Sequence, residues 1–345
     1  MARALSPLHF CLTVAGLVAF LISAAVTTPH NRYYRWQQLE TTFTRKGDWI
    51  YERLHFDPSR IDVALIGASR TGVGLSGPEI EAAYCAATGR SIYVANFGFA
   101  GVGRNLHYAI AKEAILAKQP SLVLIEINEL ETRRPHGSFV QIADAEDIMS
   151  APLFLNLNWF EDLFRLPGRQ VDLFAQTVFK TPRARTEFDP AQYQGRSDDR
   201  SREQMNLDGS TFTRFVRVPE KELDKLRRQR TNARSKFRLP ESLEPLDYRL
   251  SRVYIRKIAR LAAKNGGSAE FDFLPAYKEP TMEKNMLRDL GIDPAEVIRL
   301  GDDYALDPGM WRDATHVNAW GAIEQSRRLG AAIAERHKQL GVEGC

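Results

Sequence analysis

Three polar side chains in two short stretches have the types and spacing of a nucleophile, a base and an acid that orients the base. Ser69 lies in LIGASRTGVG (65–74), where an apolar run ends in a glycine-rich turn. Asp313 and His316 lie three residues apart in WRDATHVNAWG (311–321), so one turn of backbone can bring the carboxylate to a ring nitrogen of the imidazole. The other ring nitrogen is then free to take a proton from the Ser69 hydroxyl. Because ERLH (52–55) also places an acid three residues before a histidine, spacing alone does not identify the pair.

The glycine-rich turn has three alternative interpretations: a nucleotide-phosphate loop of the P-loop or Rossmann type, a short-chain dehydrogenase loop, and a helix cap. A P-loop requires a lysine after its second glycine, and Val73 stands there, while a Rossmann GxGxxG is absent. The turn also resembles the loop of NAD(P)-dependent short-chain dehydrogenases, and YAIAK (108–112) has the Tyr-x-x-x-Lys spacing of that family. The glycines are one residue too far apart for that loop, and the Tyr/Lys pair follows it too soon. In the third interpretation, Ser69 only caps the helix that follows.

The elements around these residues alternate between short apolar runs and helical patterns. Strands are predicted at 61–67, 91–98, 121–128, 268–275 and 296–301, and helices at 77–88, 105–118, 248–265, 281–291 and 319–340. This alternation predicts a doubly wound α/β sheet of parallel strands, in which the loops with Ser69 and His316 meet at the carboxyl edge. Residues 131–245 break the alternation and include a charged run at 221–238 that is typical of a solvated helix. We expect this insertion to be a lid or substrate platform.

An uncharged, almost wholly apolar segment from Leu8 to Val26 is long enough to cross a bilayer. A cleaved signal peptide is the alternative, although the apolar stretch is longer than usual for one. We expect an uncleaved single-pass anchor at 1–28 in the cytoplasmic membrane, a juxtamembrane linker with a short helix at 29–60, and one domain at 61–345. The basic residues that follow the anchor favour a cytoplasmic domain, but long domains translocate despite such charge, and we expect a periplasmic or other extracytoplasmic location.

Composition and cysteine usage narrow the possible functions and cofactors further. The net charge of +4, from 47 basic and 43 acidic residues, gives no case for nucleic-acid binding. Cys11 falls in the apolar segment, which leaves Cys85 and Cys345 as a possible disulfide pair. The cysteines and histidines lack the spacing of a zinc site, so we expect neither a metal nor a cofactor.

Four stretches resemble, in the same order, the sequence blocks of the SGNH (GDSL-like) hydrolases: IGASRT, NFGFAGVG, IEIN and DATHVN. The resemblance implies a flavodoxin-like three-layer α/β fold. It also implies that Ser69 is the nucleophile, His316 the base and Asp313 its partner, with the Ser69 and Gly101 amides and the Asn128 side chain as oxyanion donors. The first block reads GASR where the family has GDS, and the third lacks the family's G-x-N-D. Asn96 is therefore a rival of Asn128, and Gly98 a rival of Gly101.

On a membrane-anchored chain, this pattern resembles the branch that acylates or deacylates cell-envelope polymers, such as alginate O-acetylation and teichoic-acid D-alanyl transfer proteins. It implies a serine esterase or O-acyltransferase that acts on an extracytoplasmic glycan or acylated polymer, with a membrane protein as a candidate acyl donor. Arg70 is a candidate contact for an anionic substrate, and Trp311 and Trp320 are candidates for stacking on sugar rings. The alternative is a catalytically inactive member of the fold that binds or assembles a polymer.

Overall fold

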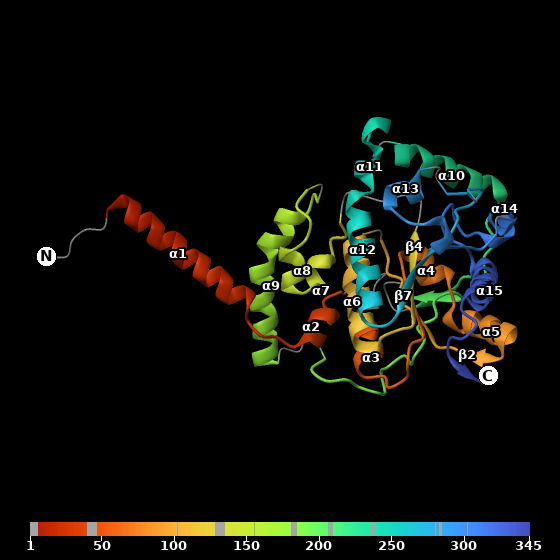
Figure 1. Cartoon of the computed structure of the whole chain (residues 1–345), viewed down its shortest axis with the longest axis horizontal. Helices are drawn as coiled ribbons and strands as arrows, with labels where there is room; N and C mark the ends of the chain where they lie inside the picture. Colours follow the sequence, from red (N-terminus) through yellow and green to blue (C-terminus); the bar gives the residue numbers. More distant parts are fainter. Residues whose placement is uncertain are drawn as a thin grey trace.

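The core of the protein is a five-stranded parallel sheet (Figure 1). The computed structural model describes residues 6–39, 47–101, 103–127, 135–154, 156–180, 185–205, 210–235, 239–279, 281–282, 285–301 and 303–345. The strand order is β3-β1-β4-β7-β8, with bounds β1 (Val63–Ile66), β3 (Val94–Asn96), β4 (Leu122–Ile127), β7 (Ser268–Phe273) and β8 (Val297–Arg299). Each of the five predicted apolar runs contains one of these strands, so the prediction of a parallel α/β sheet is confirmed.

Helices cover both faces of the sheet, which explains why β1 is wholly apolar and why β4 is apolar apart from Glu126. On one face, Ala64 and Ile66 of β1 pack in a core with α3 (Gly47–His55), α6 (Arg104–Lys118) and α12 (Arg249–Lys264). On the other face, Val63 and Leu65 pack with α5 (Gly77–Thr88) and α15 (Ala319–Arg336). The result is three layers, with α6 and α12 on the opposite side of the sheet from α5 and α15 (Figure 1). The helices predicted at 77–88, 105–118, 248–265 and 319–340 are all present.

Shorter elements connect these layers at the carboxyl-terminal half of the chain. They are α13 (Met286–Leu290), α14 (Asp303–Leu306) and the 3-10 helices η2 (Pro294–Glu296) and η3 (Pro308–Met310). The chain ends in β9 (Val342–Glu343), which pairs antiparallel with β2 (Arg90–Ser91). A disulfide between Cys85 and Cys345, with Cα atoms 6.1 Å apart, attaches this end to α5.

The insertion that we expected to be a lid or substrate platform forms two separate parts. Its first part, with α7 (Phe139–Ile142), α8 (Ala145–Met149) and α9 (Trp159–Phe179), lies beside the N-terminal helices (Figure 1). The second part contains the hairpin of β5 (Glu203–Met205) and β6 (Thr211–Thr213), followed by α10 (Glu220–Ser235), η1 (Glu241–Leu243) and α11 (Glu244–Asp247). Helix α10 matches the charged run that predicted a solvated helix, and Arg230 joins it to Glu279 after β7 by an ion pair of 2.6 Å.

The apolar N-terminal segment is one helix, α1 (Pro7–Val26), that projects from the rest of the molecule (Figure 1). It is 20 residues long, and its mean hydropathy of 2.2 is sufficient for a membrane span. The segment after it is not the linker that we expected. Helices α2 (Arg32–Gln37) and α3 are packed into the domain, because Trp36, Trp49 and Ile50 contribute buried apolar surface to the core.

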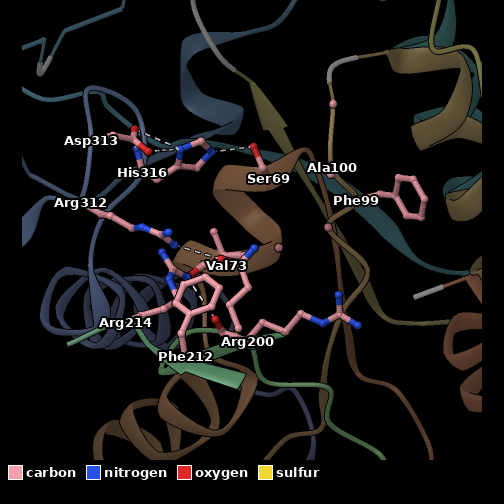
Figure 2. A pocket seen from close by; sticks show the side chains of 14 residues that line it. Ser69, Val73, Phe99, Ala100, Arg200, Phe212, Arg214, Arg312, Asp313 and His316 are labelled. Atoms are coloured by element: carbon pink, nitrogen blue, oxygen red, sulfur yellow. Dashed lines mark hydrogen bonds and ion pairs between the residues drawn. The ribbon is translucent and has the colours of Figure 1, made fainter. Parts of the chain in front are cut away.

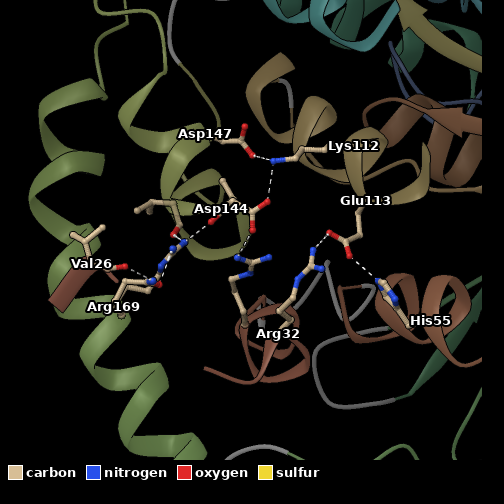
Figure 3. A network of polar contacts seen from close by, with 12 residues as sticks. Val26, Arg32, His55, Lys112, Glu113, Asp144, Asp147 and Arg169 are labelled. Atoms are coloured by element: carbon tan, nitrogen blue, oxygen red, sulfur yellow. Dashed lines mark hydrogen bonds and ion pairs between the residues drawn. The ribbon is translucent and has the colours of Figure 1, made fainter. Parts of the chain in front are cut away.

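Ion pairs hold α2 against the helices around it (Figure 3). Arg32 pairs with Glu113 of α6 at 2.6 Å, and Arg35 pairs with Asp144 at 2.7 Å, directly before α8. Lys112 of α6 lies 2.9 Å from the same Asp144 carboxylate. Burial alone would raise the pKa of Asp144, but Arg35 and Lys112 hold it well below its usual range. The network therefore stays charged and joined at neutral pH.

Candidate active site

Ser69 is the first residue of α4 (Ser69–Gly74), a short helix that follows β1 after a tight turn. The turn requires a glycine, because a Cβ atom at Gly67 would lie 2.0 Å from Thr71 Oγ1 and 2.5 Å from Glu126 Oε2. The N-cap position of α4 is occupied by Ala68, which has no polar side chain. Ser69 therefore does not fill the capping role considered from the sequence.

The side chains of Ser69, His316 and Asp313 form a continuous hydrogen-bonded chain (Figure 2). Ser69 Oγ lies 2.8 Å from His316 Nε2, and His316 Nδ1 lies 2.9 Å from Asp313 Oδ2. An ionised carboxylate only accepts hydrogen bonds, so we assign the imidazole proton to Nδ1. Nε2 is then an acceptor directed at the Ser69 hydroxyl, which is the arrangement of a nucleophile and its general base.

Asp313 is fixed by the loop that it shares with His316. Its Oδ1 atom accepts hydrogen bonds from the Thr315 amide at 2.7 Å, the Thr315 hydroxyl at 2.9 Å and the His316 amide at 2.8 Å. Burial would raise the pKa of Asp313, but these bonds and the imidazole lower it to well below the usual range. The carboxylate is therefore ionised at neutral pH and keeps the His316 ring in one orientation.

The buried carboxylate of Glu126, which we did not predict, accepts hydrogen bonds from the turn that carries Ser69. Glu126 Oε2, at the end of β4, accepts hydrogen bonds from the Ala68 amide at 2.7 Å, the Thr71 amide at 3.2 Å and the Thr71 hydroxyl at 2.6 Å. The GASR block has no acid beside its serine, and the carboxylate that holds this turn comes from the neighbouring strand β4. Glu126 is 1% exposed, and we assign it the role of a positioning residue for Ser69.

A second buried acid, Asp272, lies next to Glu126. The two residues are partners in the register of β4 and β7, so their side chains are on the same face of the sheet. Burial and the adjacent Glu126 charge raise the pKa of Asp272 to about 8. Asp272 is therefore mostly protonated at neutral pH, which avoids two adjacent buried negative charges.

Gly101 lines the cavity next to Ser69, as a backbone oxyanion donor must. Its φ of +93° is in the left-handed region, and a Cβ atom there would lie 2.6 Å from His136 Nε2. Both observations require glycine at this position. Asn128, the predicted side-chain donor, lies outside the described residues, so its role stays a prediction.

The two rivals considered for these donors are already engaged elsewhere. The Gly98 amide donates to Asn96 Oδ1 at 2.9 Å. Asn96 Nδ2 donates to the carbonyls of Thr71 at 2.8 Å and Leu75 at 2.7 Å. Asn96 thus fastens α4 to β3, and neither rival amide is directed at a substrate.

A cavity of about 420 Å³ opens beside Ser69, between the loops that carry Ser69 and His316 and the β5–β6 hairpin (Figure 2). The hairpin supplies Gln204 and Phe212 to its wall, and the histidine loop supplies Arg312. The Arg312 guanidinium lies 4.8 Å from the centre of the Phe212 ring and donates to Gln204 Oε1 at 3.1 Å. Both partners are neutral, and no carboxylate among the described residues forms an ion pair with Arg312.

Arg214 attaches the hairpin to α4, which begins at Ser69, and to the loop that contains His316. Its guanidinium donates to the carbonyls of Val73 in α4, Arg200 in the insertion at 3.1 Å, and Val317, which follows His316, at 2.5 Å. Burial lowers the pKa of Arg214 to about 10, which still leaves it charged at neutral pH. Sequence reasoning missed this residue, because a single arginine in a charged, irregular segment carries no pattern that indicates burial.

The three residues predicted to contact substrate lie outside this cavity. Arg70 donates to the Leu274 carbonyl at 2.8 Å on the other side of α4. Trp311 is fully buried and stacks on Tyr304, with ring centres 6.5 Å apart. Trp320 is partly exposed on α15 and packs against Phe215. Arg70 and Trp311 have structural contacts, and the substrate roles given to all three residues are not supported by their positions.

The residues that resemble a dehydrogenase site are engaged in the ion-pair network. Lys112 pairs with Asp147 at 2.7 Å, and Tyr108 donates to the same carboxylate at 3.2 Å. Within the described part of the chain, no cluster of three or more His, Cys, Asp or Glu side chains is placed to hold a metal ion. The chain matches no protein-family model and no curated protein in sequence. Its chemistry therefore has to be inferred from the site itself.

Proposed function

We propose that this protein is a membrane-anchored serine esterase or O-acyltransferase with an SGNH-like site. The observation that carries the proposal is the chain of hydrogen bonds from Ser69 through His316 to Asp313 at the mouth of a cavity. When the five strands of the sheet are numbered along the chain, their order across the sheet is 2-1-3-4-5. This is the order of flavodoxin-like sheets, and it supports the assignment.

The reaction begins when Ser69 Oγ attacks the carbonyl carbon of an acyl ester. The hydroxyl proton moves to His316 Nε2, and the Asp313 carboxylate stabilises the imidazolium that forms. The oxyanion is stabilised by the amides of Ser69 and Gly101, with Asn128 as the further predicted donor. The ester C–O bond then breaks, the leaving alcohol takes the proton from His316, and an acyl-serine remains.

The acyl-serine is resolved by a second hydroxyl group. Water or an acceptor alcohol gives its proton to His316 Nε2 and attacks the acyl carbon; the bond from the acyl carbon to Ser69 Oγ then breaks, and Oγ takes the proton from His316. Water completes an esterase cycle, whereas a sugar hydroxyl completes an acyl transfer. Arg312 and Phe212 in the cavity wall suit a substrate with an anionic group next to an apolar or sugar-ring face.

The proposed location is the outer side of a cytoplasmic membrane, with α1 as a single-pass anchor. The disulfide between Cys85 and Cys345 supports this side, because disulfides persist in oxidising compartments and are rare in the cytosol. A glycan or another cell-envelope polymer is then the proposed acceptor or donor of the acyl group, and a membrane protein is a candidate partner that supplies it.

Active-site labelling of the full chain in detergent tests the chemistry. A fluorophosphonate probe should label the wild type and form an adduct that maps to Ser69 by peptide mass spectrometry. Ser69→Ala and His316→Ala should lose the label, whereas Ser91→Ala, on the short strand β2, should keep it. A folded wild type that stays unlabelled, or a label that survives Ser69→Ala, would contradict the proposal and favour a polymer-binding role.

A further inference from the structure

Helix α9 presents a row of large apolar side chains to the outside of the molecule. Phe160, Phe164, Val171 and Val178 are spaced by one or two helical turns, so they share one face. Phe164 is 80% exposed and Phe160 is 63% exposed, which is unusual for phenylalanine on a folded domain. An exposed apolar surface of this kind marks a contact with another protein or with a membrane.

This row is one of three faces of α9. A second face, with Leu166, Gln170 and Leu173, is buried against the domain and the end of α1. The third face carries Glu161 and Asp172 and is exposed to water. The apolar row is therefore additional to the surface that α9 needs in order to pack on the domain.

The apolar surface continues into the loop before α9. Leu153, Phe154 and Leu157 are all exposed there. The guanidinium of Arg249 lies 4.7 Å from the centre of the Phe154 ring, which places a cation next to this apolar group. Apolar side chains flanked by cations are the composition that binds the boundary between the acyl chains and the headgroups of an anionic bilayer.

The contacts between α9 and the end of α1 indicate what covers this row. Gln170 Nε2 donates to the Val26 carbonyl at 2.9 Å, at the last residue of α1. The Asn31 amide donates to Thr177 Oγ1 of α9 at 2.9 Å. Helix α9 also forms the edge of the domain on the side from which α1 projects (Figure 1). The C-terminal end of α1 thus contacts α9 where α1 would leave a bilayer.

We infer that α9 and the loop before it form a membrane-contact surface, in which the apolar row is buried in the leaflet next to the end of α1. The occupant of this surface is lipid rather than a second protein. The inference rests on the proposed insertion of α1, but not on the chemistry of Ser69. The protein is then attached to the membrane by two elements, one across the bilayer and one along its surface.

Fluorophore quenching on the full chain in phosphatidylglycerol and phosphatidylethanolamine vesicles tests this inference. An environment-sensitive dye is attached to Phe164→Cys, with Asp172→Cys on the water-exposed face as the matched control, both in a Cys11→Ser background. In a separate sample, the free thiol of native Cys11 reports on α1 itself. Quenchers carried on lipid acyl chains and iodide in the water phase distinguish the two environments.

Lipid-borne quenchers should reduce the emission of the dyes at Phe164→Cys and Cys11, and iodide should reduce only that at Asp172→Cys. If iodide reaches Phe164→Cys while lipid quenches the Cys11 dye, α1 is inserted and the inference about α9 is wrong. Protection of Phe164→Cys from both quenchers would show that protein covers the row, which also overturns the inference. A Cys11 dye outside the lipid would refute the anchor on which it rests.

Discussion

Replacement of Asp313 by asparagine separates the two functions of this carboxylate. Oδ1 accepts three hydrogen bonds from the Thr315 and His316 loop, while Oδ2 faces His316 Nδ1 at 2.9 Å. An asparagine keeps the three loop bonds only if its oxygen takes the Oδ1 position. Its amide group must then donate to Nδ1, which moves the imidazole proton to Nε2. His316 would then donate a hydrogen bond to Ser69 and could not accept its proton.

The Asp313→Asn protein should therefore fold normally and lose nearly all reactivity. Loss of the correct tautomer costs roughly 10⁴-fold in rate in serine triads, or about 5.5 kcal/mol of barrier. The assay is the second-order rate constant for fluorophosphonate labelling of Ser69 in the full chain. Thr315→Val is the matched control, because it removes one bond to Oδ1 without changing the tautomer, and should slow labelling by about tenfold or less. An Asp313→Asn protein that labels as fast as Thr315→Val would refute the assignment of His316 as a base oriented by Asp313.

Three further predictions concern charge and covalent structure. Because Asp272 has a raised pKa in the folded protein, its contribution to stability is present below its unfolded pKa and is lost as the pH rises towards about 8. Asp272→Asn should remove this loss, so the urea midpoint should fall less between about pH 5 and about pH 8 than in the wild type; parallel curves would contradict the raised pKa. Arg312→Leu should slow hydrolysis of an ester with a carboxylate by about tenfold, the effect of one charge-assisted hydrogen bond, and leave a neutral ester nearly unaffected; equal losses on both would exclude a charge-recognition role. Cys85→Ser should lower the free energy of unfolding by about 2–5 kcal/mol, because the bond to Cys345 closes a loop across 260 positions, and a reducing agent should change the wild type but not the variant.

The sequence predicted the parts of the protein that depend on local patterns. The five strands were identifiable because their apolar runs are bounded by turns, and the Asp313 and His316 pair because both residues belong to one loop. Glu126 was not identifiable in the same way. It appears in the sequence as one acid inside an apolar strand, and nothing local shows that the Ser69 turn passes over its carboxylate.

The wall of the cavity was missed for a related reason. Its shape depends on how the β5–β6 hairpin docks, and the hairpin is fixed by bonds from Arg214 to carbonyls that are distant in sequence. The substrate contacts predicted for Arg70 and Trp311 are not supported by their positions, because proximity in sequence to Ser69 and His316 does not determine the direction of a side chain. The prediction of a linker failed because the aromatic residues at 33–36 are buried in the domain.

The ion pairs between α2 and the domain limit how far the proposed active site can move relative to α1. A flexible tether would let the domain move through a volume that grows with tether length, by about 5–6 Å times the square root of the number of residues. Here only residues 27–31 separate α1 from α2, and Arg32 and Arg35 fix α2 to Glu113 and Asp144 (Figure 3). With α1 in a bilayer, the cavity mouth stays at one height above the lipid. Acyl groups are then selected by their distance from the membrane as well as by their chemistry. A longer polymer can react only at the part of its chain that reaches the height of the cavity mouth.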